Sequence, residues 1–449
     1  MMTPKSRIQH IVKRDGTVAD FDQDRITTAI YKAAAAVGGH NKELSQKLSD
    51  EVVRVLNEAY PPPDMPSVEE IQDVAEKVLI ENGHAKTAKA YIVYRENRRR
   101  LREQRGRGKD GKSQLPYRLM YENLLWNLEH GCETIEKLNA RIADGGFPGL
   151  VLEADRAYTE GIFRAAEAIA SQSGVKLIIV AGPSSSGKTT TTAKLAGRLK
   201  ELGIETALLN LDHYFFDLED HPKDEHGDYD FETPEALDIP LINKHLKDLV
   251  EGRKVKMPYY DFKVGKRHLD ANEVSIDADK VILIDTLHGL YEPLTQSVDD
   301  ELKYKVYIET VYILRDLDRN FLRWTDLRLL RRMVRDQAQR GYDPRQTIGH
   351  WHYVRRSELK HIIPFINDAD YVLNGALPYE LPFHKKYSYR YFPDFVSEWA
   401  GDPKRRDAYI RAERIYRLLK QVDVYEDESV VPKDSLLREF IGGSVYKLH

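Results

Sequence analysis

The stretch from Val175 to Thr190 reads Val-Lys-Leu-Ile-Ile-Val-Ala-Gly-Pro-Ser-Ser-Ser-Gly-Lys-Thr-Thr, and it decides the fold of the second half of the chain. Its apolar run, Leu177 to Ala181, predicts a buried parallel strand, because strands covered on both faces are continuously apolar. The loop that follows matches the pattern G-x-x-x-x-G-K-[ST], and a helix is predicted from about Lys188 to Lys200. Backbone N–H groups of such a loop surround phosphates, and glycine permits the close approach. The stretch therefore predicts a nucleoside-triphosphate site.

Each residue type in this loop has an expected task. Lys188 is expected to reach the outer phosphates, and the Thr189 hydroxyl is expected to face Mg²⁺, the implied cofactor, with ATP as phosphoryl donor. The nucleotide-binding residues expected from the loop are Gly182, Pro183, Ser184, Ser185, Ser186, Gly187, Lys188, Thr189 and Thr190.

Length and composition limit the class of protein. With 449 residues the chain is expected to form two or three domains, and 41% hydrophobic with 31% charged residues describes a soluble globular protein. We find no apolar run of membrane-spanning length and no apolar signal segment in Met1 to Arg14, so we expect a cytoplasmic protein. The single cysteine, Cys132, excludes a disulfide within the chain and a cysteine zinc ribbon. A net charge of −4 argues against a general nucleic-acid binder.

The first hundred residues predict a small domain of one hairpin and several helices. The strands are expected at Ile8 to Val12 and Thr17 to Phe21, and Asp22 is expected to cap the first helix. Further helices are predicted around residues 44–56, from about Ser67 to Leu79, and from about residue 86 onward.

This segment resembles the ATP-cone, a regulatory nucleotide-binding module, over roughly residues 7–103. The resemblance rests on these residues: Val12-Lys-Arg-Asp-Gly16, Phe21, Arg25-Ile26, Ala29-Ile30, Tyr91 and Tyr94-Arg95. It implies a regulatory domain over residues 1–105 in which Lys13 and Arg14 contact the triphosphate of an effector nucleotide. The alternative is a surface hairpin whose charges are solvated.

A connector is predicted between the two halves, over residues 106–172. The basic run from Arg95 to Lys112 is interpreted as a solvated helix end that continues into a flexible linker, with a nucleic-acid patch as the alternative. Residues 115–172 are predicted to be wholly helical and to carry no chemistry. Cys132, which lies among them, is expected to be inert.

From Val175 onward the pattern alternates between strands and helices, which predicts a mainly parallel, doubly wound α/β sheet with helices on both faces. Strands are expected at 176–181, 205–211, 280–285, 304–314 and 370–373. The predicted core spans residues 173–380, with an acceptor-binding insertion at 214–275, and residues 381–449 form an extension that packs on the core. The aromatic and basic stretch from Phe383 to Phe392 is expected to be an extended edge or interface segment.

Two carboxylates follow predicted strands: Asp212 follows residues 205–211, and Asp285 ends the strand at 280–285. Ligands in such sheets bind at the carboxyl ends of the strands. Phosphoryl transfer to an alcohol requires a carboxylate that accepts the hydroxyl proton and an acidic partner for Mg²⁺. Each aspartate could instead be an ordinary helix cap.

From about residue 174 to 380 the chain resembles the uridine kinase/phosphoribulokinase group of P-loop kinases. Besides the phosphate loop, the resemblance rests on Asp212-His-Tyr-Phe215, Asp230-Phe-Glu-Thr-Pro-Glu-Ala-Leu-Asp238, Pro258-Tyr-Tyr-Asp-Phe262 with Arg267, and the arginine-rich Asp326-Leu-Arg-Leu-Leu-Arg-Arg-Met-Val-Arg-Asp336. It implies Asp212 as the catalytic base and a lid over residues 319–341. The other strand-end acid, Asp285, is then expected with Thr189 at the metal. The lid residues implied are Arg328 and Arg332 in catalysis and Arg335 at ATP, and the acceptor-binding residues implied are Tyr214, Glu232, Tyr260, Arg267 and Arg328.

The departures from the family pattern concern the acceptor. The base-reading histidine of uridine kinases falls at Gly265, and the usual Glu-Gly after the third strand reads Asp285-Thr286. The segment Arg438-Glu-Phe-Ile-Gly-Gly443 is similar to a uridine-kinase-like subgroup. The sequence therefore predicts an ATP-dependent kinase for a small acceptor, a uridine- or cytidine-type nucleoside above others.

Two alternatives stay open, a kinase for a sugar, polyol or sugar phosphate and a nucleotide-sensing regulatory P-loop protein. A homo-oligomer is also expected, with no membrane or nucleic-acid partner.

Overall fold

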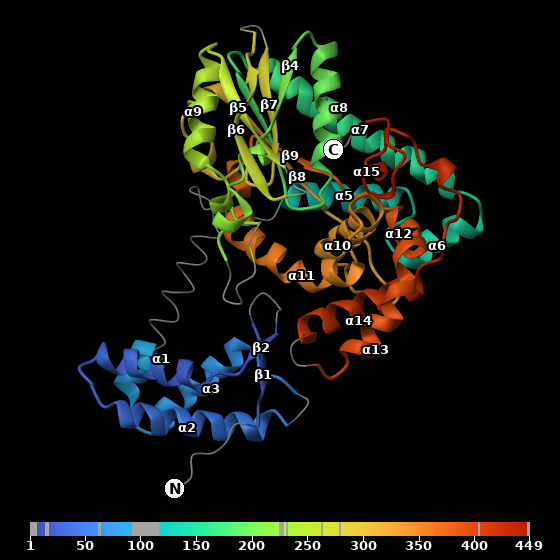
Figure 1. The fold of residues 1–449 in the computed structure, drawn as a ribbon. Coiled ribbons are helices and arrows are strands. Elements are labelled where there is room, and N and C mark those ends of the chain that lie inside the picture. The colour runs from blue at the N-terminus through green and yellow to red at the C-terminus, as the bar shows by residue number, and fades with distance from the viewer. Residues whose placement is uncertain are drawn as a thin grey trace. The chain divides into compact units, whose positions relative to one another are not determined.

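The chain forms two compact units in the computed structural model, Met1–Gly106 and Arg107–His449 (Figure 1). The structure describes residues 7–13, 18–61, 64–91, 116–223, 229, 232–261, 264–277, 280–402 and 405–446. Arg14, the basic run from Arg95 to Lys112, and Asp230-Phe231 of the acceptor motif lie outside these residues. Within the described part, no helix is both long and apolar enough to cross a membrane.

The first unit packs a short hairpin with helices. Its strands β1 (His10–Val12) and β2 (Val18–Asp20) are antiparallel, and its helices include α1 (Gln23–Ala35), α2 (Lys42–Ala59) and α3 (Val68–Glu81). Residues 85–91 are helical as well.

Local sequence signals explain where these helices begin. Asp22 accepts a hydrogen bond from the backbone of Asp24 at the start of α1, and Ser67 with Glu70 forms a capping box at the start of α3. The apolar faces of the helices meet in one core that includes the fully buried Ile30 and Leu56. The first unit therefore has a hydrophobic core of its own.

The second unit is built on a five-stranded parallel sheet in the order β4-β7-β3-β8-β9. The prediction of an α/β fold with a parallel sheet is confirmed. The bounds of its strands are β3 (Leu177–Ala181), β4 (Thr206–Asn210), β7 (Val281–Thr286), β8 (Lys303–Glu309) and β9 (Tyr371–Asn374).

Helices cover both faces of this sheet. Alternate residues of β3 point to opposite sides, so Ile178 and Val180 join one core cluster while Leu177 and Ile179 join the other. The first cluster includes α7 (Phe147–Ser171) and α8 (Lys188–Glu201), and the second includes α9 (Ile239–Val250). Figure 1 shows α7 and α8 on one side of the sheet and α9 on the other.

Other elements pack on the two core clusters: β5 (Val255–Asp261) contributes to the second, and the helices that follow β8 contribute to the first. The antiparallel strands β5 and β6 (Lys266–Val274) follow α9 and form a separate ribbon. The remaining α-helices that the structure describes are α5 (Tyr117–Glu129), α6 (Ile135–Ala143), α10 (Trp324–Arg335), α11 (Pro344–Ser357), α12 (Glu380–Ser388), α13 (Phe392–Trp399), α14 (Arg406–Gln421) and α15 (Arg438–Ile441).

The structure differs from two sequence-based expectations. The strand expected at 304–314 ends at Glu309, and the apolar residues that follow are a buried irregular segment. Side chains satisfy its backbone: Asn374 accepts from the Val311 N–H, and Asn127 donates to the Ile313 carbonyl. The stretch 383–392, expected to be extended, is helical, because Phe383 and other residues of α12 pack inside the first core cluster.

Candidate active site

The phosphate loop lies between the end of β3 and the start of α8. Its glycines are required by their surroundings, because a Cβ on Gly182 would lie 2.5 Å from the Ile308 carbonyl oxygen. Gly187 has φ +96° at the N-cap of α8, in the region that glycine adopts without strain. Ser185 also has a positive φ, 60°, and is buried, so the loop keeps a constrained backbone.

Arginines of α10 hold the carbonyl oxygens of this loop. Arg331 donates to the carbonyls of Ser185 (3.3 Å) and Ser186 (3.2 Å), and Arg328 donates to the carbonyl of Ser184 (3.0 Å). Arg332 donates to the Ser184 hydroxyl at 3.1 Å. Carbonyl oxygens repel anions. Because the arginines bind these oxygens on the outer side of the loop, the inner side is favourable for a phosphate.

Each of these arginines is also paired with a carboxylate. Glu358 pairs with Arg328, which is 2% exposed, and Glu232 accepts from Arg332 at 2.8 Å. Arg328 and Arg332 lie beside the loop and support its residue Ser184; their direct action on the transferred phosphate stays a prediction. Arg335 is the arginine of this helix whose charge acts on Lys188.

Arg331 is a residue that the sequence reasoning missed. It is fully buried, and its guanidinium donates to both carboxylate oxygens of Glu380, at 2.7 and 2.5 Å. The signal was present in the sequence, because positions 328, 331, 332 and 335 have the spacing of a single helix face.

The charged residues at the strand ends surround Lys188. In the sheet register Asp285 of β7 lies opposite Val180 of β3, and Asn210, two residues before Asp212, lies opposite Asp285. Burial lowers the pKa of Lys188, while Asp285 and Asp212 act in the opposite direction. Adjacent parallel strands thus bring Asp285, and Asn210 just ahead of Asp212, to the edge of the sheet at the phosphate loop.

The neighbours of Asp285 shift the pKa of its carboxyl in opposite directions. Its pKa is raised to about 6, mainly by burial; the carboxylates of Glu439 and Asp212 contribute to the rise, and the charge of Lys188 opposes it. The Thr189 hydroxyl donates to Asp285 and favours the charged form. A further cation beside this buried carboxylate would stabilise its charged form.

These groups suit Mg²⁺. Among the described residues no cluster of three or more His, Cys, Asp or Glu side chains could hold a metal by itself. Mg²⁺ takes oxygen ligands and is often held by one or two protein groups together with substrate phosphates. The Thr189 hydroxyl and the Asp285 carboxylate, both at the phosphate loop, fit that pattern.

Two of the residues expected to bind the acceptor, Tyr214 and Tyr260, are buried. Tyr214 is fully buried in the second core cluster, and its hydroxyl bonds His245 Nδ1 at 2.9 Å. Tyr260 is 3% exposed, and its backbone N–H donates to His213 Nδ1 at 3.3 Å. Both tyrosines are therefore buried within the insertion, and their contact with an acceptor stays a prediction.

Gly265 forms part of a tight turn between β5 and β6. Its φ is +67°, and a Cβ there would lie 2.9 Å from Leu218 Cβ, so a histidine at this position would be strained. Two described cations beside it are paired: Lys266 pairs with Asp217 at 3.1 Å and also with Glu219, and Arg267 pairs with Asp238 at 2.8 Å. Lys263 lies outside the described residues.

Glu439 is a second residue that the sequence reasoning missed. It accepts from the backbone N–H of Thr190 at 3.0 Å and from the Thr190 hydroxyl at 2.8 Å, although 249 residues separate the two. The sequence motif 438–443 was noticed only as a family mark, and its position in the chain gave no indication of this contact.

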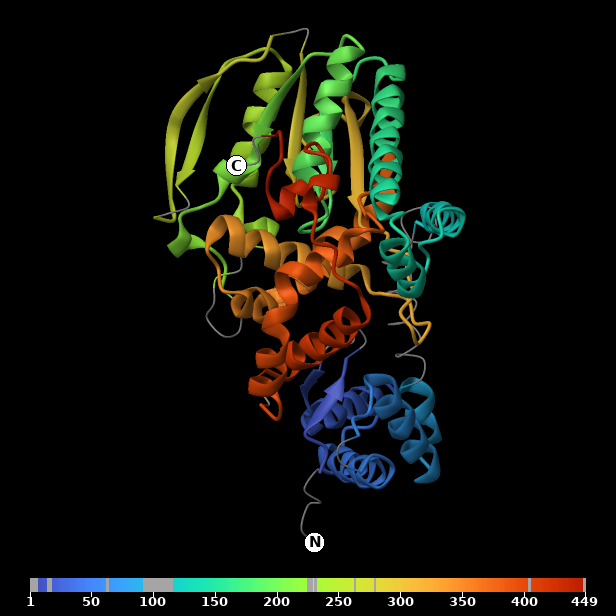
Figure 2. The same ribbon diagram turned by 90° about the vertical axis from the view of Figure 1, so that its right-hand side faces the viewer.

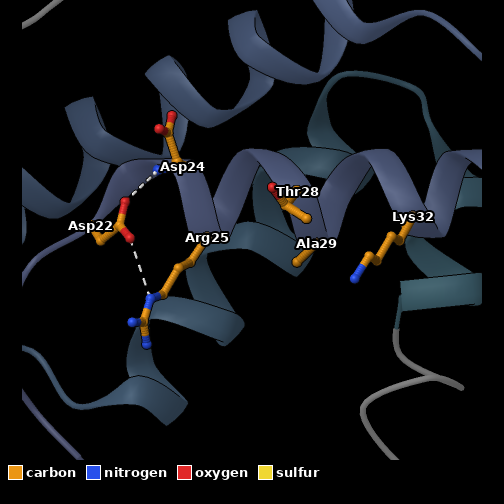
Figure 3. A pocket seen from close by; sticks show the side chains of 6 residues that line it. All are labelled: Asp22, Asp24, Arg25, Thr28, Ala29 and Lys32. Carbon is orange, nitrogen blue, oxygen red and sulfur yellow. Dashed lines mark hydrogen bonds and ion pairs between the residues drawn. The ribbon is translucent and has the colours of Figure 1, made fainter. Parts of the chain in front are cut away.

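The first unit has an open cavity of about 380 Å³ along α1 (Figure 3). Arg25 and Lys32 point their cationic ends from the same side of this helix, and Arg25 Nε lies 3.3 Å from Asp22. The cavity is lined by Asp22, Asp24, Arg25, Thr28, Ala29 and Lys32. Lys13, the expected triphosphate contact, is exposed and is not among the lining residues.

Comparison with known proteins gives two matches to families. Residues 9–100 match the ATP cone domain, and residues 177–378 match the Phosphoribulokinase / Uridine kinase family. A uridine kinase of Deinococcus deserti is 31% identical over 198 residues, which cover 44% of this chain and 86% of that protein.

Two further proteins are similar to this chain, one over a smaller part of it and the other at a lower sequence identity. A vitamin B12-dependent ribonucleoside-diphosphate reductase of Thermoplasma acidophilum is 46% identical over 103 residues, which are 22% of this chain and 13% of the reductase. A solved structure described as a "Possible Uridine Kinase" from Bacillus stearothermophilus is 15% identical and covers 48% of this chain and 98% of its own, with a TM-score of 0.34.

Proposed function

This chain belongs to the phosphoribulokinase/uridine kinase family, and from that premise we propose that it transfers the γ-phosphoryl group of ATP to the 5′-hydroxyl of a uridine- or cytidine-type nucleoside. As a member it is a P-loop phosphotransferase with an alcohol acceptor. The acceptor, the metal and the regulatory role of the ATP cone are parts of the proposal.

The observation that carries the proposal is the meeting of Asp212 and Asp285 at Lys188. A P-loop that only binds a nucleotide does not need a second strand-end carboxylate. In the proposed reaction Asp212 accepts the proton of the attacking hydroxyl, and Lys188 stabilises the charge on the transferring phosphoryl group. Arg335, whose charge already acts on Lys188, lies where it can assist.

Thr189 and Asp285 are proposed to hold Mg²⁺ together with the nucleotide phosphates. The bound ion would neutralise charge on the phosphates during transfer. Asp285 is suited to this task because burial keeps its carboxylate partly desolvated, so a cation gains more there than at an exposed aspartate.

The surroundings of Gly265 favour a neutral acceptor over a sugar phosphate. An anionic acceptor would need free cations, and of Lys263, Lys266 and Arg267, the two that the structure describes, Lys266 and Arg267, are occupied by ion pairs with aspartates. To bind an acceptor phosphate, Lys266 or Arg267 would have to leave its aspartate, and the carboxylate left unpaired would repel that phosphate. This supports a nucleoside, with neutral sugars and polyols as the second candidates.

For the ATP cone we propose that an effector nucleotide such as ATP or dATP binds and changes the activity or assembly of the chain. Support comes from the match of residues 9–100 to the domain and from the cationic side chains Arg25 and Lys32 at the α1 cavity. The contact of Lys13 and Arg14 with the triphosphate stays a prediction.

A panel of acceptors assayed with MgATP tests the proposal. It should contain uridine, cytidine, neutral sugars and polyols, and their phosphates, with ADP release and the phosphorylated product both measured. Turnover of a pyrimidine nucleoside that is abolished in Asp212→Asn supports the proposal. Turnover of a sugar phosphate above every nucleoside contradicts the choice of acceptor. If the chain binds ATP and turns over no acceptor, a nucleotide-sensing regulator replaces the kinase.

A further inference from the structure

The C-terminal segment lies against the start of α8, at the phosphate loop. Figure 1 and Figure 2 show α15, in red, close to α8. A Cβ on Gly187 would lie 2.4 Å from Leu436 Cδ1, so this leucine packs directly against the loop at Gly187. Further along α8, Lys194 pairs with Asp434 at 2.6 Å, and this ion pair attaches the same segment to the helix.

Within this segment Glu439 takes an unusual position. It is 5% exposed, and one of its carboxylate oxygens accepts from both the backbone N–H and the hydroxyl of Thr190. Thr190 is the third residue of α8, so its N–H is one of the donors at a helix start that have no partner within the helix. In a phosphate loop these donors face the bound phosphates.

The same donor cannot serve two anions. With Glu439 3.0 Å from the Thr190 N–H, a phosphate oxygen of the nucleotide cannot reach that position at the same time. The carboxylate would also repel the phosphates, since it lies close enough to affect the ionisation of Lys188 and Asp285.

We propose that Glu439 occupies a phosphate subsite of the P-loop and that the C-terminal segment is a built-in competitor that MgATP must displace. The bond to Thr190 stabilises the closed segment when the nucleotide is absent. When the nucleotide is bound, a phosphate oxygen takes over both donors of Thr190, and Glu439 moves out. This inference rests on the P-loop as the nucleotide site and does not depend on the acceptor.

The segment is also linked to the arginine-rich part of the chain. Gln339, which follows α10, donates to the backbone carbonyl of Glu439 at 3.0 Å. Displacement of Glu439 therefore breaks or shifts a contact with residues 336–340, next to the helix whose arginines hold the loop. Nucleotide binding and movement of the residues after α10 are coupled through this bond.

The test is the affinity for ATP, measured by calorimetry on the full chain without any acceptor. Glu439→Gln keeps the shape of the side chain and removes its charge, and it should bind MgATP about tenfold more tightly, because a charged hydrogen bond no longer competes. Glu426→Gln is the matched control: it removes the same charge from an exposed side chain of the C-terminal part that pairs only with Lys386 at 3.6 Å in the described contacts, has no bond to Thr190 or α8 there, and should leave the affinity within about twofold.

Three results would overturn the proposal: unchanged affinity in Glu439→Gln, weaker affinity in it, or an equal gain in both variants. A second measurement does not depend on a variant. In the unaltered chain, saturating MgATP should speed amide hydrogen exchange in a peptide covering residues 434–446. Equal or slower exchange there would mean that the segment stays closed over the nucleotide, and Glu439 would not be a competitor.

The outcome is separable from that of the proposed function. If no acceptor is phosphorylated but Glu439→Gln binds ATP more tightly, the kinase proposal fails and the competitor stands. If nucleosides are phosphorylated and Glu439→Gln binds ATP as the unaltered chain does, only the competitor fails.

Discussion

Arg331 and Glu380 form a two-bond ion pair that is fully buried in the protein, with N–O distances of 2.7 and 2.5 Å. The same guanidinium holds the carbonyls of Ser185 and Ser186, and it also donates to that of Gly375 at 2.5 Å. A buried charge is tolerated only when its hydrogen bonds are satisfied, and here the loop carbonyls and Glu380 together satisfy Arg331. The shape of the phosphate loop therefore depends on an ion pair between α10 and α12.

Removing one partner of this pair should be costly. We expect Glu380→Gln to lower the free energy of unfolding by about 3–5 kcal/mol, because the buried Arg331 charge loses its counterion. Urea-induced unfolding followed by circular dichroism measures the change. Glu398→Gln is the control, since Glu398 pairs with Arg345 at the surface and should contribute at most about 1 kcal/mol. Equal losses in the two variants would contradict the role given to Glu380.

The same pair predicts sensitivity to acid. Burial raises the pKa of Glu380, but Arg331 more than offsets this, and the pKa is lowered from 4.5 to about 2. The stabilisation is therefore fully present above pH 4.5 and is lost as the pH falls from about 4.5 toward 2. Unfolding measured across this range should lose stability less steeply in Glu380→Gln than in the unaltered chain.

The proposed catalytic base is tested by Asp212→Asn. The amide cannot accept the proton of the acceptor hydroxyl, so turnover should fall by about 10²–10⁴-fold while the affinity for MgATP stays nearly the same. Steady-state kinetics and calorimetry measure the two quantities. Asp368→Asn changes an exposed aspartate in the same way and should leave both unchanged. Nearly full turnover in Asp212→Asn would exclude this residue as the base.

The pH profile tests the role of Asp285. Its carboxylate has a pKa of about 6 in the chain without nucleotide, so protonation below that pH should abolish its use as a metal ligand. We expect kcat/KM for MgATP to fall as the pH drops through about 6. The acid limb of kcat should lie at lower pH, because Mg²⁺ in the complex stabilises the charged carboxylate. Identical acid limbs for kcat and kcat/KM would argue against metal binding by Asp285.

The ATP cone is tested by counting bound nucleotides. Lys13→Ala should remove one nucleotide site per chain and leave the P-loop site, because the variant loses a cation expected at the effector triphosphate. Equilibrium dialysis with labelled ATP measures the stoichiometry. Arg54→Ala is the control: Arg54 is also an exposed cation of this unit, and it pairs with Glu51 and Glu58 of its own helix. An unchanged stoichiometry in Lys13→Ala would contradict the proposed contact.

Cys132 provides a readout of folding. The thiol is fully buried, and burial raises its pKa to about 12. At pH 8 only about one thiol in ten thousand is then ionised, so alkylation by iodoacetamide should be very slow in the folded chain and fast in urea. Mass spectrometry of the intact chain measures the extent. Rapid modification of the folded chain would mean that this part of the structure opens readily.

The local signals of the sequence were sufficient for the elements of the site. The apolar run before Gly182 and the helix after Gly187 specified a strand, a phosphate loop and a helix, because those patterns depend on neighbouring residues alone. Asp212 and Asp285 could be placed at the same sheet edge, because parallel strands present their carboxyl ends together. The caps at Asp22 and Ser67 are local as well.

Long-range packing decided the conformation of the stretch 383–392 and the surroundings of the α10 arginines. The basic and aromatic stretch 383–392 was expected to be extended, but burial of residues such as Phe383 in the core makes it helical. The arginines of α10 have the composition of a phosphate-binding lid. Their partners Glu358 and Glu380 lie far along the chain and bind their charges, which no local pattern reveals.

By itself the sequence predicted a P-loop and a parallel sheet from local patterns, and it predicted an ATP cone from the resemblance of a few short motifs to that module. Only the tertiary structure decided what stands around the P-loop. Arg331 donates a hydrogen bond to a carbonyl of the loop. Glu439, which follows Thr190 by 249 residues, accepts a hydrogen bond from the Thr190 amide N–H. Contacts across such distances arise when separate elements are packed into one core, and the spacing of residues along the chain does not encode them.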